Sequence, residues 1–304
     1  MKANAIIRII VWSLTIIVLL SIILAVISFD LYRYNAESIL QNVAIDRGEL
    51  TLEEDSPAAT IYIDQTSEFT FDSNQIHEIE INWAAGSILI MPHDVEKIEV
   101  SESGNNDPKY AMECYLKHDK LIINFSEKTK YNNRGFGITL SEDLSKDLRI
   151  LVPRDWNLNT LEINAASAKL EVCDMTIYDV EIDTASGICE FENCNVDTID
   201  LDTASGDIKF VGTLNILDCD AASANVVAIL SNTPSQIDMD SMSGDLDITL
   251  PPDCGFTVST EGLTSDFSSD FSTTMKNGNH IHGDGRCRID VDAMSGDVTI
   301  RKAE

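Results

Sequence analysis

Residues 181–187 read EIDTASG, and residues 200–206 repeat the phrase as DLDTASG. Further copies with the same order of acidic, apolar and small residues stand at 80–86, 162–168, 218–224, 238–244 and 290–296. The sixth position of the phrase, here called the marker, is a serine at 167, 186, 205, 223 and 243, at intervals of 19, 19, 18 and 20 residues. A short and nearly constant period indicates a repeat architecture in which each unit is one coil of a stack.

Apolar residues alternate on both sides of the marker. The positions six and four residues before it are apolar in every copy, as at Val180 and Ile182, and so are the positions three and five residues after it, as at Cys189 and Phe191. Alternation with a period of two predicts β-strands that each bury one face. Each repeat therefore contains two short strands, and the copies must stack to share a core.

The corner between the two strands consists of small residues, Ser-Gly in four copies and Ser-Ala at Ala168 and Ala224. Glycine allows positive φ angles and close approach of neighbouring backbones, as a stacked bend requires. The sequence thus predicts an all-β fold, a parallel β-solenoid of roughly 19-residue two-strand coils over residues 60–304. An antiparallel sandwich is the alternative, but its successive strands would not be expected to present the same residue at the same offset.

The amino-terminal residues predict a membrane anchor. Residues 9–29 carry no charge and are mainly Ile, Val and Leu, which is long enough to cross a bilayer as a helix. Lys2 and Arg8 precede this run, so the positive-inside rule favours a cytoplasmic amino terminus. A cleaved signal peptide is the alternative, but its apolar region would be shorter. We therefore expect a single-pass protein of the cell membrane, with its bulk outside the cell, organised as a short cytoplasmic segment at 1–8, a transmembrane helix at 9–29, a juxtamembrane linker at 30–59 and the solenoid at 60–304.

Charge narrows the classes of partner. The 304 residues include 51 acidic and 21 basic ones, which gives a formal net charge of −30. Nucleic acid is excluded, because phosphate binding needs a basic surface. Protein partners, cell-wall polymers and divalent cations remain.

Acidic residues recur five and three residues before the marker, at positions that must face outward if their neighbours are buried. Equal positions in neighbouring coils lie about 4.8 Å apart, and like charges at that spacing repel by about 1 kcal/mol per pair in water. A bridging divalent cation is one hypothesis, and Ca²⁺ favours such oxygen-rich sites. The other interpretation is a solvated anionic face that aids solubility. The candidate ligands are Glu181, Asp183, Asp200, Asp202, Asp218, Asp220, Asp238 and Asp240.

Catalytic and zinc-binding patterns are scarce. Seven cysteines, an odd number with no CxxC pair, exclude a complete disulfide framework within one chain. We expect most of them to be buried apolar residues, although a pair such as Cys189 and Cys194 could oxidise outside the cell. Of the histidines, only His280 and His282 stand two apart, which is an incomplete metal site. The recurring serine suits a corner, because a nucleophile needs one site with a nearby base.

Several phrases together resemble one family. They are the repeated strand, Ser-Gly-Asp, strand units, the LPP of 250–252 followed by GFTV at 255–258, and the closing GDGRCRIDVDAMSGDVTI at 283–300. These are similar to the bacterial DUF4097 proteins, a family also associated with adhesins, over roughly residues 60–304. The resemblance implies a β-solenoid, often found at membranes or in the cell envelope, and it carries over no catalytic residues.

Taken together, the sequence predicts a membrane-anchored, non-catalytic cell-envelope protein. Its rigid acidic solenoid would serve as an adhesin-like interaction or scaffold surface, with repeated contacts to a protein or cell-wall polymer. Two alternatives come from other classes: a carbohydrate-active cell-wall enzyme that uses paired carboxylates, and a cytoplasm-facing regulator of an envelope-stress response.

Overall fold

The computed structural model describes residues 68–104, 110–126, 145–262 and 266–304. The predicted cytoplasmic segment, transmembrane helix and juxtamembrane linker lie outside these residues. Within the described ranges, no helix is both long and apolar enough to span a bilayer.

The described residues form strands and one short 3-10 helix, η1 (Ser73–Gln75), which confirms the prediction of an all-β fold. The strands are β1 (Glu68–Phe71), β2 (Glu78–His93), β3 (Ile98–Gly104), β4 (Glu113–Lys117), β5 (Lys120–Asn124), β6 (Lys146–Pro153), β7 (Asn157–Cys173), β8 (Thr176–Leu230), β9 (Gln236–Ser243), β10 (Leu246–Leu250), β11 (Phe256–Gly262), β12 (Phe267–Ser269), β13 (Thr274–Lys276), β14 (Asn279–His282), β15 (Cys287–Ala293) and β16 (Val298–Lys302).

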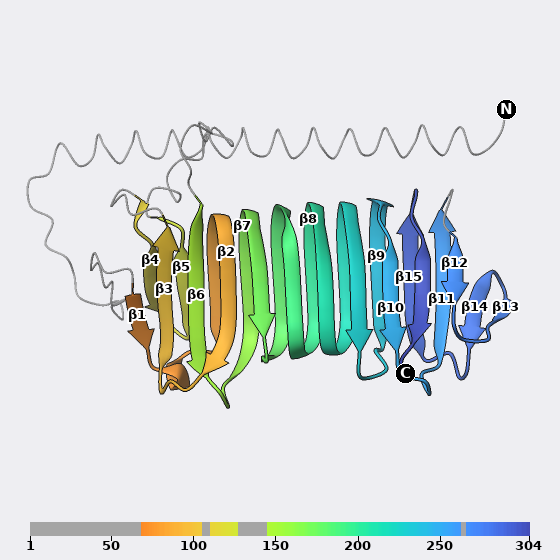
Figure 1. The fold of residues 1–304 in the computed structure, drawn as a ribbon, viewed down its shortest axis with the longest axis horizontal. Helices are drawn as coiled ribbons and strands as arrows, with labels where there is room; N and C mark the ends of the chain where they lie inside the picture. Colours follow the sequence, from red (N-terminus) through yellow and green to blue (C-terminus); the bar gives the residue numbers. More distant parts are fainter. Residues whose placement is uncertain (1–67, 105–109, 127–144, 263–265) are drawn as a thin grey trace, which may run out of the picture. The chain divides into compact units, whose positions relative to one another are not determined.

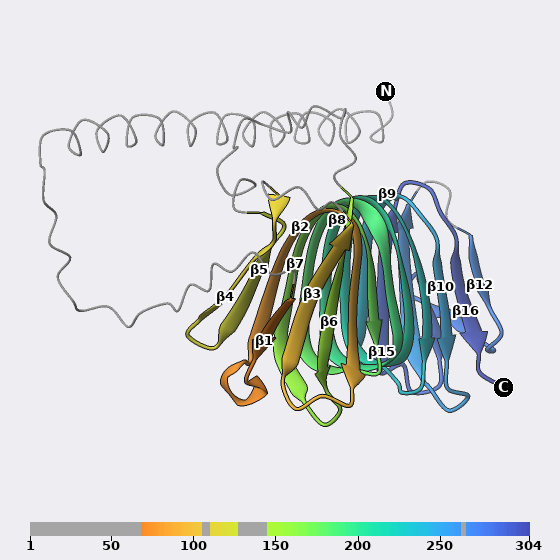
Figure 2. The same ribbon diagram turned by 60° about the vertical axis from the view of Figure 1, so that its left-hand side comes forward.

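The repeated residues wind into parallel coils stacked in a row (Figure 1). In the pairing of β7 with β8, Leu161 lies opposite Val180 and Ile163 lies opposite Ile182, an offset of one repeat. The 55 residues of β8 continue through successive coils without a break in extended structure. Each coil is a flattened loop with a sheet on either side of its interior (Figure 2). The pairing confirms the predicted parallel stacking of equal offsets.

The interior holds the apolar residues predicted from the alternation. Ile182, Leu201 and Met239 are at most 3% exposed and belong to one hydrophobic cluster. On the opposite strand of the coil, Phe191 and Phe210 of successive turns pack against each other with tilted rings whose centroids are 5.8 Å apart. A continuous apolar column of this kind is the main stabilising feature of a solenoid, because no single coil can bury its own face.

The two kinds of corner have different residues. At the marker corner, a Cβ added to Gly244 would lie 1.7 Å from the carbonyl oxygen of Ala224 in the neighbouring coil, so glycine is required there. The opposite corner was not anticipated from the sequence. It is formed by Asp174 and Asn193, 19 residues apart and both with φ of +54°, a conformation that Asp and Asn tolerate better than most residues. The Asn193 amide donates to the Asp174 carboxylate at 2.6 Å.

The order of the coils departs from chain order at the carboxyl end. β15 lies between β9 and β11, and β16 lies between β10 and β12, so the last repeat is inserted into the stack rather than placed at its end. The last repeat keeps the apolar offsets and the corner glycine, and it can therefore stack on both neighbours. This arrangement pairs both edges of the final strands and leaves residues outside the repeat to cover the end.

Antiparallel pairs close both ends of the stack, where the expectation of parallel coils is wrong. At the amino-terminal end they are β1 with β3, β3 with β6, and β4 with β5, and at the carboxyl-terminal end β14 pairs antiparallel with β11 and β13. The strands of these antiparallel pairs lack a close copy of the repeated phrase. At the amino-terminal end, the copy at 80–86 lies in β2, which pairs in parallel with β5, β6 and β7. We call the described residues of this end, 68–104, 110–126 and 145–153, the amino-terminal cap.

Candidate functional site: the acidic face

Acidic residues from successive coils lie in register on one face of the stack. We call the outward side chains five and three residues before each marker the acidic face. Glu162 is paired with Glu181, Asp218 with Asp238, and Asp238 with Asp290. Seven of the predicted ligands are exposed and Asp238 is half-buried. The structure thus brings together the acidic residues that the sequence singled out, in rows rather than around one point.

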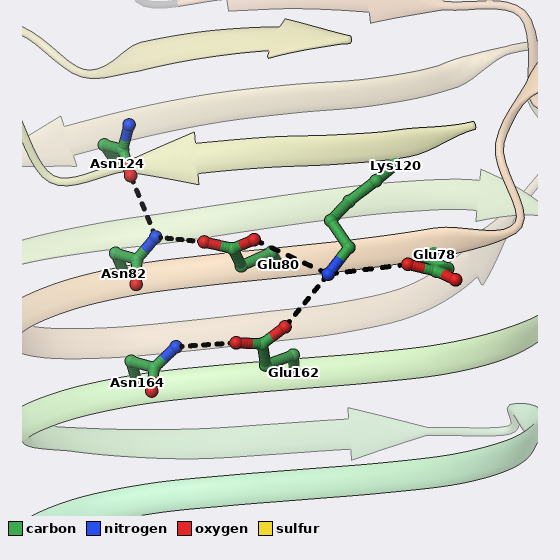
Figure 3. A network of polar contacts seen from close by, with 7 residues as sticks. All are labelled: Glu78, Glu80, Asn82, Lys120, Asn124, Glu162 and Asn164. Atoms are coloured by element: carbon green, nitrogen blue, oxygen red, sulfur yellow. Dashed lines mark hydrogen bonds and ion pairs between the residues drawn. The ribbon is translucent and has the colours of Figure 1, made fainter. Parts of the chain in front are cut away.

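The amino-terminal end of the acidic face is neutralised by a lysine from outside the repeat. Lys120, at the start of β5, places its Nζ 3.4 Å from Glu78, 3.6 Å from Glu80 and 3.1 Å from Glu162 (Figure 3). Burial alone would lower the pKa of Lys120, but the carboxylates around it, Glu162 first, raise the pKa overall. One cation therefore serves carboxylates of neighbouring strands.

Amide side chains complete this end. Asn82 donates from Nδ2 to Glu80 and to the Asn124 side-chain oxygen, both at 2.9 Å, and Asn164 donates to Glu162 at 3.2 Å (Figure 3). Asparagine stands here in the row three before the marker, whereas the later coils have aspartate. The substitution of amide for carboxylate removes like-charge repulsion and supplies a donor.

The middle of the acidic face has a different electrostatic character. Although these side chains are exposed, partial burial of the carboxyl groups raises the pKa of Asp200, Asp218 and Asp220, and nearby carboxylates raise it further. The pKa of Glu181 is raised for the same reasons, with Asp179 as the first of its acidic neighbours. The fold therefore holds these carboxylates together against their mutual repulsion.

At the carboxyl-terminal end of the acidic face, the negative charge is partly neutralised. Arg288 bonds to Asp290 of its own strand, and the Gln236 amide donates to Asp238 Oδ2 at 2.5 Å. The other oxygen of Asp238, Oδ1, is buried and finds no hydrogen-bond partner in the part of the chain that the structure describes. This oxygen has residual capacity for a donor or a cation.

The predicted calcium ligands do not converge on one point. In the described ranges, no group of three or more His, Cys, Asp or Glu side chains is arranged as it would be around a metal ion. His280 and His282 belong to the carboxyl-terminal end instead, where His280 stacks on Phe267 at 4.1 Å and His282 contacts Phe256 at 5.4 Å. Calcium binding by the acidic rows therefore stays a prediction.

A second row of polar side chains, Asp and Asn, which the sequence analysis did not assign, has a structural role. In the later coils, the side chain two residues after the marker accepts a hydrogen bond from the backbone N–H of its counterpart in the next coil: Asn225 donates to Asp207 at 3.0 Å, Asp245 to Asn225 at 3.1 Å, and Asp297 to Asp245 at 2.9 Å. The recurrence of Asp after Ser-Gly was the available signal. These side chains satisfy backbone groups at the corner.

A buried lysine was also missed. Lys146 is 1% exposed, and its Nζ bonds to Glu102 and to the carbonyl oxygens of Tyr110 (2.8 Å) and Phe125 (2.6 Å). It also lies over the rings of Trp83 and Phe125, 4.9 and 4.1 Å from their centroids. Burial lowers the pKa of Lys146, and the Glu102 carboxylate opposes that shift. In the sequence Lys146 is an ordinary polar residue between loop and strand.

Comparison with known proteins gives a family. Three solved structures are similar, and each match covers 78% of this chain. They are a putative cell adhesion protein of Clostridium sporogenes (11% identity, 98% of that chain covered, TM-score 0.31) and a putative adhesin of Bacteroides fragilis (14% identity, 96% covered, TM-score 0.46). The third is a putative lipid-binding protein of Parabacteroides distasonis (12% identity, 96% covered, TM-score 0.40). No curated protein matches the sequence. The model of the Toastrack DUF4097 family matches residues 76–301, which is most of the chain, and the protein therefore belongs to this family.

Proposed function

We propose that this protein is a non-catalytic component of the cell envelope that uses the acidic face as an adhesin-like interaction or scaffold surface. In this proposal the helix predicted at 9–29 anchors the chain in the membrane, and the solenoid lies outside the cell. The partner is a protein or cell-wall polymer that presents positive charge. Nucleic acid is not a partner, because the net charge of −30 would repel phosphate.

The observation that carries this proposal is the row of unbalanced carboxylates in the middle of the acidic face. Among the described residues, Glu181, Asp200, Asp218 and Asp220 form no ion pair, and their pKa values are raised by partial burial and by neighbouring carboxylates, although Lys120 opposes the shift at Glu181. A cationic partner would relieve this repulsion, so part of the binding free energy would come from strain stored in the free protein.

Rigidity favours the same function. The outward carboxylates alternate with fully buried residues such as Leu201 and Cys219, which fix their positions. Repeated contacts on a rigid surface reinforce one another, because the second contact is intramolecular once the first has formed. Several weak ion pairs can thus give firm attachment to a polymer or to a dense layer of partner protein.

The test is an attachment assay with cells that produce the full chain. The quadruple variant Asp200→Asn, Asp202→Asn, Asp218→Asn, Asp220→Asn should reduce attachment by at least tenfold. The matched control, Glu96→Gln, Glu99→Gln, Asp155→Asn, Asp253→Asn, changes the net charge equally at exposed positions away from the acidic face and should attach like the wild type. Equal attachment by both variants would refute the acidic face as the binding surface.

The location is tested separately. Six of the seven cysteines are buried and Cys173 is half-buried, so a new exposed thiol can be distinguished from them. Met275 is 62% exposed, and the variant Met275→Cys should react with a membrane-impermeant maleimide on intact cells. Labelling only after lysis would place the solenoid inside and favour the cytoplasm-facing alternative.

The same carboxylates could instead be neutralised by Ca²⁺ bound between neighbouring coils. If Ca²⁺ bridges neighbouring coils, millimolar Ca²⁺ should raise the melting temperature of the full chain, and the quadruple variant should lose the increase. An equal response to Mg²⁺, or an equal response in the quadruple variant, would show general charge screening instead.

A further inference from the structure

Two cysteines meet inside the carboxyl-terminal end of the stack. Cys254 directly precedes β11, and Cys287 is the first residue of β15, the strand paired in parallel with β11. Their side chains are 1% and 0% exposed, both are free thiols in the structure, and the two thiols lie close enough for each to shift the pKa of the other. The backbone N–H of Cys287 donates to the carbonyl oxygen of Gly255 at 3.0 Å, which holds the two segments together.

The pair named in the sequence analysis has different surroundings. Cys194 donates from Sγ to the carbonyl oxygen of Val172 at 3.3 Å, and Cys189 belongs to the apolar interior of the coil. Burial raises the pKa of both thiols, which disfavours their reactive thiolate forms. Cys254 and Cys287 instead act on each other: the pKa of the Cys254 thiol is lowered and that of the Cys287 thiol is raised.

We propose that Cys254 and Cys287 form a disulfide bond that ties together two neighbouring coils of the stack. The bond would span the point at which coil order departs from chain order, since β15 is inserted beside β11. The loop that it closes contains β12, β13 and β14, the strands at the carboxyl-terminal end of the stack. Both side chains are buried in the same apolar interior, on segments joined by the hydrogen bond from Cys287 to Gly255, and a disulfide would bring the two sulfurs to about 2.05 Å.

The reaction is a two-electron oxidation, and its oxidant is another disulfide, such as glutathione disulfide or the disulfide of a thiol oxidoreductase. The Cys254 thiolate attacks one sulfur of that disulfide and releases one thiol, leaving a mixed disulfide on Cys254. The Cys287 thiol gives up its proton, and its sulfur then attacks Cys254 and releases the second thiol. Two thiols of the protein are oxidised, and one external disulfide is reduced to two thiols.

The bond has to form while the chain folds, because both side chains are fully buried in the finished stack. It would persist in an oxidising compartment, which is where the proposed function places the solenoid. Its formation in vitro does not depend on that function. A failed attachment assay and an absent disulfide are therefore separate results.

The direct test is to refold the full chain from denaturant in a glutathione redox buffer. Free thiols are then blocked with N-ethylmaleimide under denaturing conditions, and the digest is mapped by mass spectrometry without reduction. We expect one linked pair of peptides, containing Cys254 and Cys287, and maleimide on the remaining five cysteines. Maleimide on all seven, or a link between other cysteines, would overturn the proposal.

Melting experiments provide the second readout. Reductant should lower the melting temperature of the refolded wild type by about 10 °C, because the bond restricts the unfolded chain. Cys254→Ala and Cys287→Ala should melt at the same temperature with and without reductant, whereas the control Cys219→Ala should keep the wild-type response. A reductant effect that survives in Cys254→Ala would contradict the assignment, and the peptide map of the wild type is informative even if a variant does not fold.

Discussion

The amino-terminal cap and the repeated coils solve the same problem, that of placing charge on a β-sheet protein, in opposite ways. In the cap, Lys120 and Lys146 each contact defined carboxylates, and the polar groups around them are hydrogen-bonded. In the coils, the outward carboxylates of Asp200 and Asp218 face one another without a cation in the described structure. The cap therefore depends on specific polar contacts, whereas the coils depend on apolar packing and close corners and carry uncompensated carboxylates on their outer face.

The largest expected effect is the loss of the buried lysine in the cap. Lys146→Met keeps the length of the side chain but leaves the largely buried Glu102 carboxylate without its cation and removes one hydrogen bond each from the carbonyl oxygens of Tyr110 and Phe125. Removal of one partner of a buried ion pair costs about 3–5 kcal/mol. Chemical denaturation of Lys146→Met should show a loss of this size.

A double variant distinguishes the pair from its surroundings. Lys146→Met with Glu102→Gln removes both charges and should recover part of the lost stability, since no unpaired charge remains. If Lys146→Met alone is as stable as the wild type, the contrast between cap and coils fails.

The second largest expected effect is the loss of stability when the glycine of a marker corner is replaced. Gly244 has φ of +154°, and an added Cβ would lie 1.7 Å from the Ala224 carbonyl oxygen. Gly244→Ala should therefore lower the free energy of unfolding by about 2–3 kcal/mol through strain and displacement of the neighbouring coil. Gly278 is the control, because a Cβ there meets nothing within 4 Å although φ is also positive. Equal losses in both variants would show that the φ angle, and not the close stacking, sets the cost.

The repeated coils could be predicted because their information is local and redundant. The offsets of Ile182, Leu201 and Met239 from their markers predict the buried face, the register and the parallel stacking that the structure has. The acidic rows followed from the same periodicity. The corner at Asp174 and Asn193 could have been predicted from its 19-residue spacing and from two residue types that tolerate a positive φ angle. It is less conspicuous than the marker corner because it lacks the Ser-Gly phrase.

The caps could not be predicted, because their contacts join residues with no repeated spacing. Nothing near Lys120 in the sequence indicates that it reaches Glu162, 42 residues away. The burial of Lys146 depends on Glu102, Tyr110 and Phe125, which are brought together only by the folded cap. The position of the last repeat could not be predicted either, but for a different reason. Its phrase matches the repeat so well that it would fit at more than one position in the stack.

The smallest effects test the charge contrast directly, with two substitutions of the same chemical kind. Asp218→Asn removes a carboxylate from the unbalanced middle of the acidic face and should stabilise the fold by about 0.5–1 kcal/mol. Glu162→Gln removes a carboxylate that Lys120 contacts at 3.1 Å and should destabilise it by up to about 1 kcal/mol. Denaturation midpoints measured at low salt should shift in opposite directions, and shifts of the same sign would contradict the contrast.

The pH dependence of the same carboxylates follows from the direction of their pKa shifts. Because the pKa of Asp218 is higher in the folded chain than in the unfolded chain, the folded state holds more protons between those two values. Stability therefore falls as the pH rises through that window, and the full penalty is present above the raised pKa. On acidification from pH 7 the penalty fades, and it is gone below the ordinary carboxyl value of about 4. The difference in melting temperature between Asp218→Asn and the wild type should accordingly be greatest at neutral pH and shrink toward pH 4. A difference that is constant with pH would mean that the substitution acts through packing rather than charge.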